Sequence, residues 1–142
     1  MLNKHHFYKL QFILLIPLVA TSLKLLGIHF TVNLFCNPKK FKRVPLVDNL
    51  QNARLILRAL KQAVKTSKYN GSCLSRSIVL QRLLQNSGIS SDIKIGVRKI
   101  DKEFKAHAWV EHQEVPLNAG AKVRMRYQIL ESYNITNKLE FS

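Results

Sequence analysis

The spacing of apolar residues changes from a helical to a strand-like period near residue 90. Between residues 48 and 86, apolar side chains recur every three or four positions, whereas residues 92–98 alternate apolar and polar. Two more strand-like segments, residues 106–111 and 115–118, follow after short gaps, which favours antiparallel pairing. The sequence therefore predicts an α+β fold in which N-terminal helices pack on a small antiparallel sheet.

The N-terminal part of the chain is apolar but interrupted. Residues 7–27 are expected to form one helix, kinked or broken at Pro17 and ended by Gly27. A connector with two prolines and four basic residues follows at residues 37–45. We therefore divide the chain into an apolar helix with its basic connector, residues 1–47, and a core over residues 48–142. A chain of 142 residues is too short for two separate cores, so both parts are expected to form one compact domain.

The apolar helix has more than one interpretation. A membrane span needs about 20 apolar residues without charge, and Pro17 and Lys24 limit this run. We favour a helix that packs on the domain or touches a membrane surface; a secretory signal with a weak cleavage site at residues 20–22 is the alternative. The expected location is the cytoplasm, with membrane association as an option, and there Cys36 and Cys73 stay reduced.

The charge of the chain is strongly basic. Twenty-three Lys and Arg face eight Asp and Glu, a net charge of +15, which favours an acidic or polyanionic partner. The basic residues are spread over all expected elements, without the aromatic–basic motif of a nucleic-acid reader, so no nucleic-acid partner is expected. The Cys and His spacings match no zinc pattern and no Gly-rich phosphate loop is present, so neither a metal nor a cofactor is expected.

Cys73 is the candidate nucleophile. A helix is expected to begin with Asp48 as its cap, and the next helix, Cys73–Asn86, has Ser72 as its N-cap and ends at Gly88. A helix N-terminus favours thiolate over thiol, and its unpaired N–H groups can stabilise an oxyanion. A buried structural cysteine is the alternative interpretation.

His107 is the expected partner of Cys73. It lies on the strand Ala106–Glu111, where alternation places His107 and Trp109 on one face. An imidazole there can hold the thiolate as an ion pair and later protonate the leaving amine. Trp109 is the candidate for shielding the pair from water, and Trp109 and Tyr69 are the candidates for binding substrate. The alternative is that His107 is a hydrogen-bonded core residue and that Trp109 and Tyr69 only pack.

A third residue should orient the imidazole ring. Asn118 ends the expected strand 115–118, which a hairpin returns towards His107. An amide oxygen can accept the ring N–H, as it does in papain-like proteases. Glu111 and Glu114 are the alternative orienting groups, and Glu111 alternates onto the face of His107.

The order of these motifs resembles the transglutaminase-like cysteine protease domain of lasso peptide biosynthesis B proteins in their stand-alone form. The resemblance covers about residues 10–120 and rests on five segments: Cys73–Ser77, Gly88–Ile89, Ile95–Lys99, Ala106–Glu111 and Pro116–Asn118. It implies a papain- or transglutaminase-like core with Cys73 as nucleophile and His107 as general base and acid. The implied activity is removal of the leader from a ribosomally made precursor peptide through a thioester on the cysteine.

The resemblance also implies partners. These are the precursor peptide, an asparagine-synthetase-like cyclase that acts after cleavage, and a separate leader-recognition protein, because this chain has no room for such a domain. One departure concerns the Asp that the family places about a dozen residues after the His: Ala119 stands there, with Asn118 just before it. A non-catalytic basic adaptor for the precursor or a membrane surface, and acyl transfer to an amine, are the alternative functions.

Overall fold

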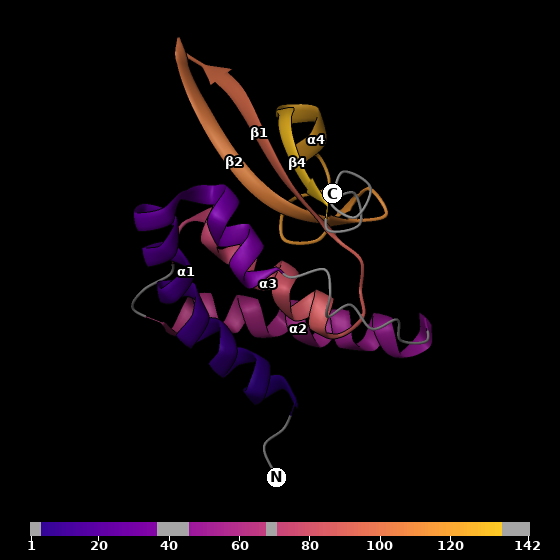
Figure 1. Ribbon diagram of the computed structural model, residues 1–142. Helices are drawn as coiled ribbons and strands as arrows, with labels where there is room; N and C mark the ends of the chain where they lie inside the picture. The colour runs from indigo at the N-terminus through magenta and orange to yellow at the C-terminus, as the bar shows by residue number, and fades with distance from the viewer. Residues whose placement is uncertain (1–3, 37–45, 68–70, 135–142) are drawn as a thin grey trace.

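The structure, a computed structural model, describes residues 4–36, 46–67 and 71–134. It confirms the predicted α+β class, with three long helices grouped at one side of a small sheet (Figure 1). In chain order the elements are α1 (Lys4–Phe35), α2 (Leu46–Thr66), α3 (Cys73–Asn86), β1 (Asp92–Ile100), β2 (Glu103–His112), β3 (Val115–Pro116), α4 (Val123–Arg126) and β4 (Gln128–Asn134).

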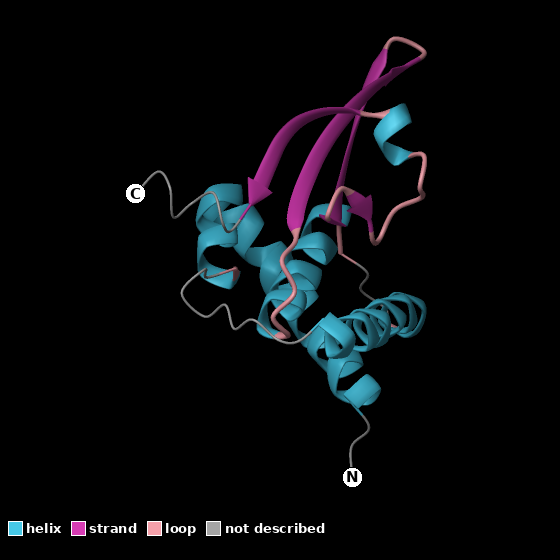
Figure 2. Ribbon diagram, turned by 90° about the vertical axis from the view of Figure 1, so that its right-hand side faces the viewer, coloured by secondary structure: helices cyan, strands magenta, loops and turns pink. Residues whose placement is uncertain are grey.

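The sheet is antiparallel throughout, in the order β3-β2-β1-β4. The β1–β2 hairpin is longer than expected, because only Asp101 and Lys102 form the turn instead of the whole charged segment 99–105. Both turn residues have positive φ, 49° and 68°, the combination of a two-residue hairpin turn whose twist matches that of the strands. The hairpin therefore projects beyond the helices (Figures 1 and 2).

The strands near the C-terminus differ from expectation. β3 ends at Pro116, two residues early. The Leu117 N–H still donates to the Val110 carbonyl at 2.8 Å, but the Val110 N–H donates to the Asn118 side chain and not to a backbone carbonyl. Residues 122–133 show no clear period in the sequence, yet they contain α4 and most of β4. β4 pairs with β1, and the register of this pairing shifts between Ile95 and Gly96 of β1, which face Glu131 and Ile129.

α1 is longer than the predicted helix. Pro17 lies inside it, and the backbone leaves helical geometry only at Gly27, where φ is 82° and ψ is 174°. The helix then resumes and runs to Phe35, and the two parts point in different directions (Figure 1). The basic connector at residues 37–45 lies outside the described residues. α2 begins at Leu46, two residues before the cap predicted at Asp48.

One hydrophobic core joins the helices to one face of the sheet. α1 contributes its inner side to this core, so the apolar N-terminal helix packs with the segments that follow the connector. Figure 2 shows the three long helices together below the strands. The buried members include Phe12, Ile16 and Val19 of α1, Ile56 and Ala59 of α2, Ile78, Leu80 and Leu84 of α3, and Ile93 and Val110 of the sheet.

Candidate active site

The first turn of α3 is fixed by a capping box. The Ser72 hydroxyl accepts the backbone N–H of Ser75 at 3.1 Å, and the Ser75 hydroxyl accepts the backbone N–H of Ser72 at 2.9 Å. This confirms the predicted N-cap. The two bonds satisfy donors that a helix start otherwise leaves unpaired, and they hold Cys73 as the first residue of the helix. Its thiol is partly exposed.

The loop before Cys73 passes tightly against α1. Gly71 has a φ of +64°, and a Cβ added there would lie 2.5 Å from both the Ile16 Cγ2 and the Ser75 Oγ. Only glycine fits this conformation and this space. The position of Cys73 therefore depends on a close contact between its loop and the N-terminal helix.

The three residues predicted to be catalytic line one cavity. Cys73 of α3, His107 of β2 and Asn118 after β3 all border a space of about 610 Å³. They come from three separate elements, which the packing of α3 on β2 and the β2–β3 hairpin bring together. The fold thus gathers residues that lie 34 and 45 positions apart from Cys73 in the sequence.

The cavity has an apolar wall and a basic lining. α2 supplies aliphatic side chains, and three cations border the same space, whereas no Asp or Glu does so among the described residues. Such a surface suits an extended peptide that carries aliphatic and acidic side chains. The aliphatic residues are Leu57, Leu60 and Val64, and the cations are Lys61, Lys65 and Arg76.

The His107 ring packs against two aromatic rings. It stacks on Trp109 with centroids 5.9 Å apart and 24° between the planes, and it lies 5.5 Å from the Tyr127 ring. Burial, and secondly the positive charge of Arg76, lower the pKa of His107 below its ordinary value of 6.5. The imidazole is therefore neutral at pH 7 and able to accept a proton. In the described part of the chain, no hydrogen bond joins it to the Cys73 thiol.

Trp109 is a packed residue of the sheet and not part of the cavity wall. It is fully buried, and its indole N–H donates to the Glu111 carboxylate at 2.7 Å, which also accepts from Arg124 at 2.8 Å. These contacts confirm that His107, Trp109 and Glu111 share a face. Trp109 does not border the cavity, and Tyr69, the other candidate for substrate binding, lies outside the described residues.

Asn118 is held by two hydrogen bonds. Its amide oxygen accepts the backbone N–H of Val110 at 2.8 Å, and its amide nitrogen donates to the Ser77 hydroxyl at 3.3 Å. The structure gives the amide oxygen a backbone donor where the sequence suggested the imidazole. Of the two alternative orienting groups, Glu111 is already engaged by the Trp109 indole and by Arg124, and Glu114 is a turn residue with φ 65°.

Sequence reasoning missed two neighbours of the site. Arg76 follows Cys73 by three residues, a spacing that puts both side chains on one side of a helix and could have indicated its place. Tyr127 gave no comparable signal, because its contact with His107 depends on how the C-terminal segment returns to the sheet.

Sequence comparison adds one finding to this geometry. The family model of the Transglutaminase-like superfamily matches residues 16–132. No curated protein and no solved structure gives a significant match. The matched range begins inside α1 and ends inside β4, so it contains the whole cavity and both sides of the predicted boundary at residue 47.

Proposed function

Because the chain belongs to the transglutaminase-like superfamily, we propose that it is a cysteine peptidase that removes the leader from a ribosomally made lasso precursor peptide. The observation that carries the peptidase proposal is the cavity that Cys73, at the capped start of α3, shares with His107. The choice of substrate rests on the motif resemblance, above all Gly96–Lys99 followed by Ala106–Glu111.

The proposed reaction proceeds through a thioester. His107 removes the proton from the Cys73 thiol as the sulfur attacks the scissile carbonyl carbon. The resulting oxyanion is stabilised by backbone N–H groups at the start of α3. The carbon–nitrogen bond then breaks, and His107 gives its proton to the departing amine of the core peptide. Water hydrolyses the thioester, which releases the leader with a free carboxylate and restores the thiol.

The resting state suits the first of these steps. The lowered pKa of His107 keeps its imidazole neutral, so it is ready to take the thiol proton. Catalytic hydrogen bonds often shorten only when substrate is bound, and we propose that the precursor brings the thiol and the ring into contact. Arg76 borders the cavity and adds positive charge where the oxyanion develops.

The cavity lining supports a peptide substrate. Leu57, Leu60 and Val64 offer an apolar wall for an aliphatic side chain, and Lys61 and Lys65 attract a carboxylate beside it. We propose that a separate leader-recognition protein presents the precursor in the cytoplasm. The cyclase then receives the newly exposed amine of the core peptide.

The proposal is tested by cleavage of the precursor in the presence of the recognition protein, read by mass spectrometry. Wild type should release the core peptide, and Cys73→Ala and His107→Ala should not. Cys36→Ala is the matched control, because Cys36 is the other cysteine and is buried away from the cavity, with its thiol donating to the Ile78 carbonyl at 3.7 Å. Circular dichroism checks that each variant is folded. Cleavage that persists in Cys73→Ala would overturn the proposal.

A second candidate function is a non-catalytic basic adaptor that binds the precursor. The Asn118 amide bonds Val110 and Ser77 and not the His107 imidazole, which favours a function without catalysis. The cationic lining of the cavity favours binding of an acidic peptide. The same set of variants separates the two functions. An adaptor retains precursor binding and supports maturation in Cys73→Ala, and its binding weakens steeply with added salt.

A further inference from the structure

α1 is apolar on two opposite sides, and only one of them is covered. Phe12, Ile16 and Val19 point into the core. The other side carries an outer stripe of large apolar residues, of which Leu14 is 59% exposed and Leu18 58% exposed. The members follow one another at steps of three, four or seven residues, which places them on one helix face. We define the outer stripe as Phe7, Leu10, Leu14, Leu18 and Leu25.

The position of the outer stripe limits what can cover it. α1 is long and apolar enough to cross a membrane. Its inner side, however, packs on α2 and α3 as part of the single core, so lipid cannot surround the helix while the domain is folded. Only the outer side is available. A folded chain can therefore meet a bilayer with α1 lying along the surface.

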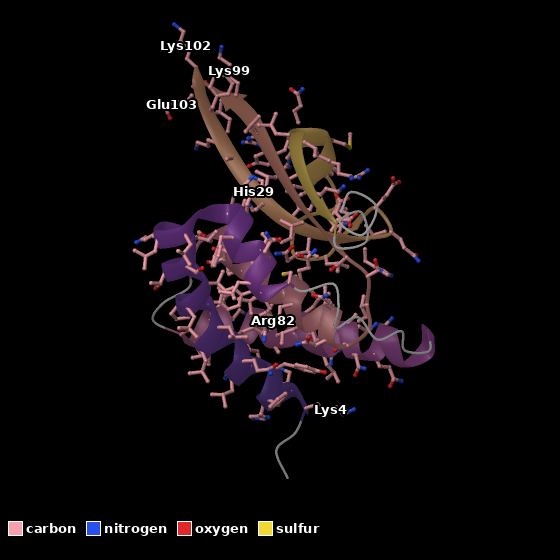
Figure 3. All side chains as sticks on the ribbon, in the orientation of Figure 1. Lys4, His29, Arg82, Lys99, Lys102 and Glu103 are labelled. Carbon is pink, nitrogen blue, oxygen red and sulfur yellow. The ribbon has the colours of Figure 1, made fainter. Side chains whose placement is uncertain are left out.

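The charge of α1 indicates the kind of surface. Residues 4–35 contain three lysines and no acidic residue. Lys4 extends from the N-terminal end of the helix, away from the domain (Figure 3), and Lys24 is exposed directly before Leu25. Lysines beside an apolar stripe can keep their charge at the headgroups while their stems lie along the acyl chains. The stripe and its lysines thus complement an anionic lipid surface.

We infer that the outer stripe docks the protein on an anionic membrane surface, with α1 lying in the plane of the interface. A net charge of +15 draws the chain towards anionic lipid and opposes contact between two copies at this face. The apolar stripe then supplies the binding energy, because each leucine that leaves water stabilises the bound state. Docking itself requires no reaction at Cys73.

The test is flotation of the full chain with vesicles. Wild type should float with phosphatidylcholine vesicles that contain phosphatidylglycerol, and less with phosphatidylcholine alone. Leu14→Gln combined with Leu18→Gln should lower the partition coefficient at least about tenfold. The matched control is Met125→Gln with Leu130→Gln, because these side chains are 84% and 61% exposed but lie on α4 and β4. Circular dichroism verifies folding.

Three outcomes would overturn the inference. One is that wild type fails to float with the anionic vesicles. Another is that the stripe variant floats as well as the wild type, or no worse than the control variant. The third combines analytical ultracentrifugation with flotation: the wild type is a dimer, the stripe variant is a monomer, and both bind vesicles equally. That result would assign the stripe to contact with a second copy of the chain.

Discussion

Asn118 links the helix that carries Cys73 to the strand that carries His107. Its side-chain amide donates to the hydroxyl of Ser77, one turn beyond Cys73 on α3, and accepts from the backbone of Val110 on β2. The residue that sequence reasoning placed beside the imidazole thus connects the two elements of the site. Asn118 therefore bridges α3 and β2, the elements that carry the proposed nucleophile and the proposed base.

Replacing Asn118 should cost stability. Asn118→Ala leaves the Val110 N–H without its acceptor, and such a loss costs about 1–3 kcal/mol. Urea denaturation measures the change in unfolding free energy. Asn118→Asp keeps an acceptor oxygen for the Val110 N–H and should lose less stability than Asn118→Ala. A variant Asn118→Ala as stable as wild type would contradict this reading.

The pH dependence of cleavage should reflect the lowered pKa of His107. Burial first, and Arg76 second, disfavour the charged imidazole, so the acidic limb of kcat/KM should lie below pH 6.5. Arg76→Gln removes one of the two causes of the lowered pKa and should move that limb to higher pH. Lys102→Gln, at the hairpin tip (Figure 3), removes an equal charge far from the ring and should leave the limb in place. An unchanged limb in Arg76→Gln would show that the arginine does not act on His107.

Stability should follow the same titration. A lowered pKa in the folded state means that the folded protein favours the neutral imidazole over the charged one more than the unfolded chain does. The contribution of His107 is therefore fully present above about pH 6.5 and is lost as the pH falls through the lower folded value. His107→Gln should flatten the fall in melting temperature below pH 6.5, measured by scanning calorimetry, and a slope equal to that of wild type would contradict the prediction.

Gly96 should not tolerate a methyl group. An added Cβ would lie 2.8 Å from the Cβ of Tyr127 and 2.9 Å from the Trp109 ring, which is itself fully buried. Overpacking of this kind costs about 1–3 kcal/mol. Thermal denaturation of Gly96→Ala checks the prediction, with Gly120→Ala as control, because nothing lies within 4 Å of a Cβ at residue 120. Equal melting temperatures for the two variants would contradict it.

The cations of the cavity should govern substrate affinity. Lys61→Glu combined with Lys65→Glu reverses two charges at the lining and should raise KM for a precursor with acidic residues near the cleavage site. A precursor whose acidic residues are changed to amides should lose that sensitivity. Lys99→Glu with Lys102→Glu reverses the same number of charges on the hairpin and should leave KM nearly unchanged.

The start of α3 could be predicted because its signals are local. Ser72 accepts an N–H only three residues away, so the cap, the first residue Cys73 and the end near Gly88 are all determined by neighbours in sequence. The shared face of His107 and Trp109 follows equally from strand alternation. The sequence could therefore predict the local positions of Cys73 and His107.

Other features depend on contacts between distant segments. β4 forms by pairing with the edge of β1, and the sequence of residues 122–133 does not predict this pairing by itself. The contact between Tyr127 and His107 depends on the same pairing. The tight β1–β2 turn uses two non-glycine residues with positive φ, Asp101 and Lys102, where a longer turn looked more favourable. The bonds of Asn118 likewise arise from the docking of α3 on β2.

The close approach of Gly71 to Ile16 couples the loop before Cys73, the proposed nucleophile, to the N-terminal helix. Packed protein interiors are nearly incompressible, so a displacement of α1 pushes directly on the loop that ends at Cys73. If a membrane holds α1 as we infer, a pull on that helix would shift the loop before Cys73, and attachment would then adjust the proposed turnover as well as the location. A chain cut between Ile16 and Gly71 would keep Cys73, His107 and Asn118 but would break the covalent link between α1 and the loop that it supports.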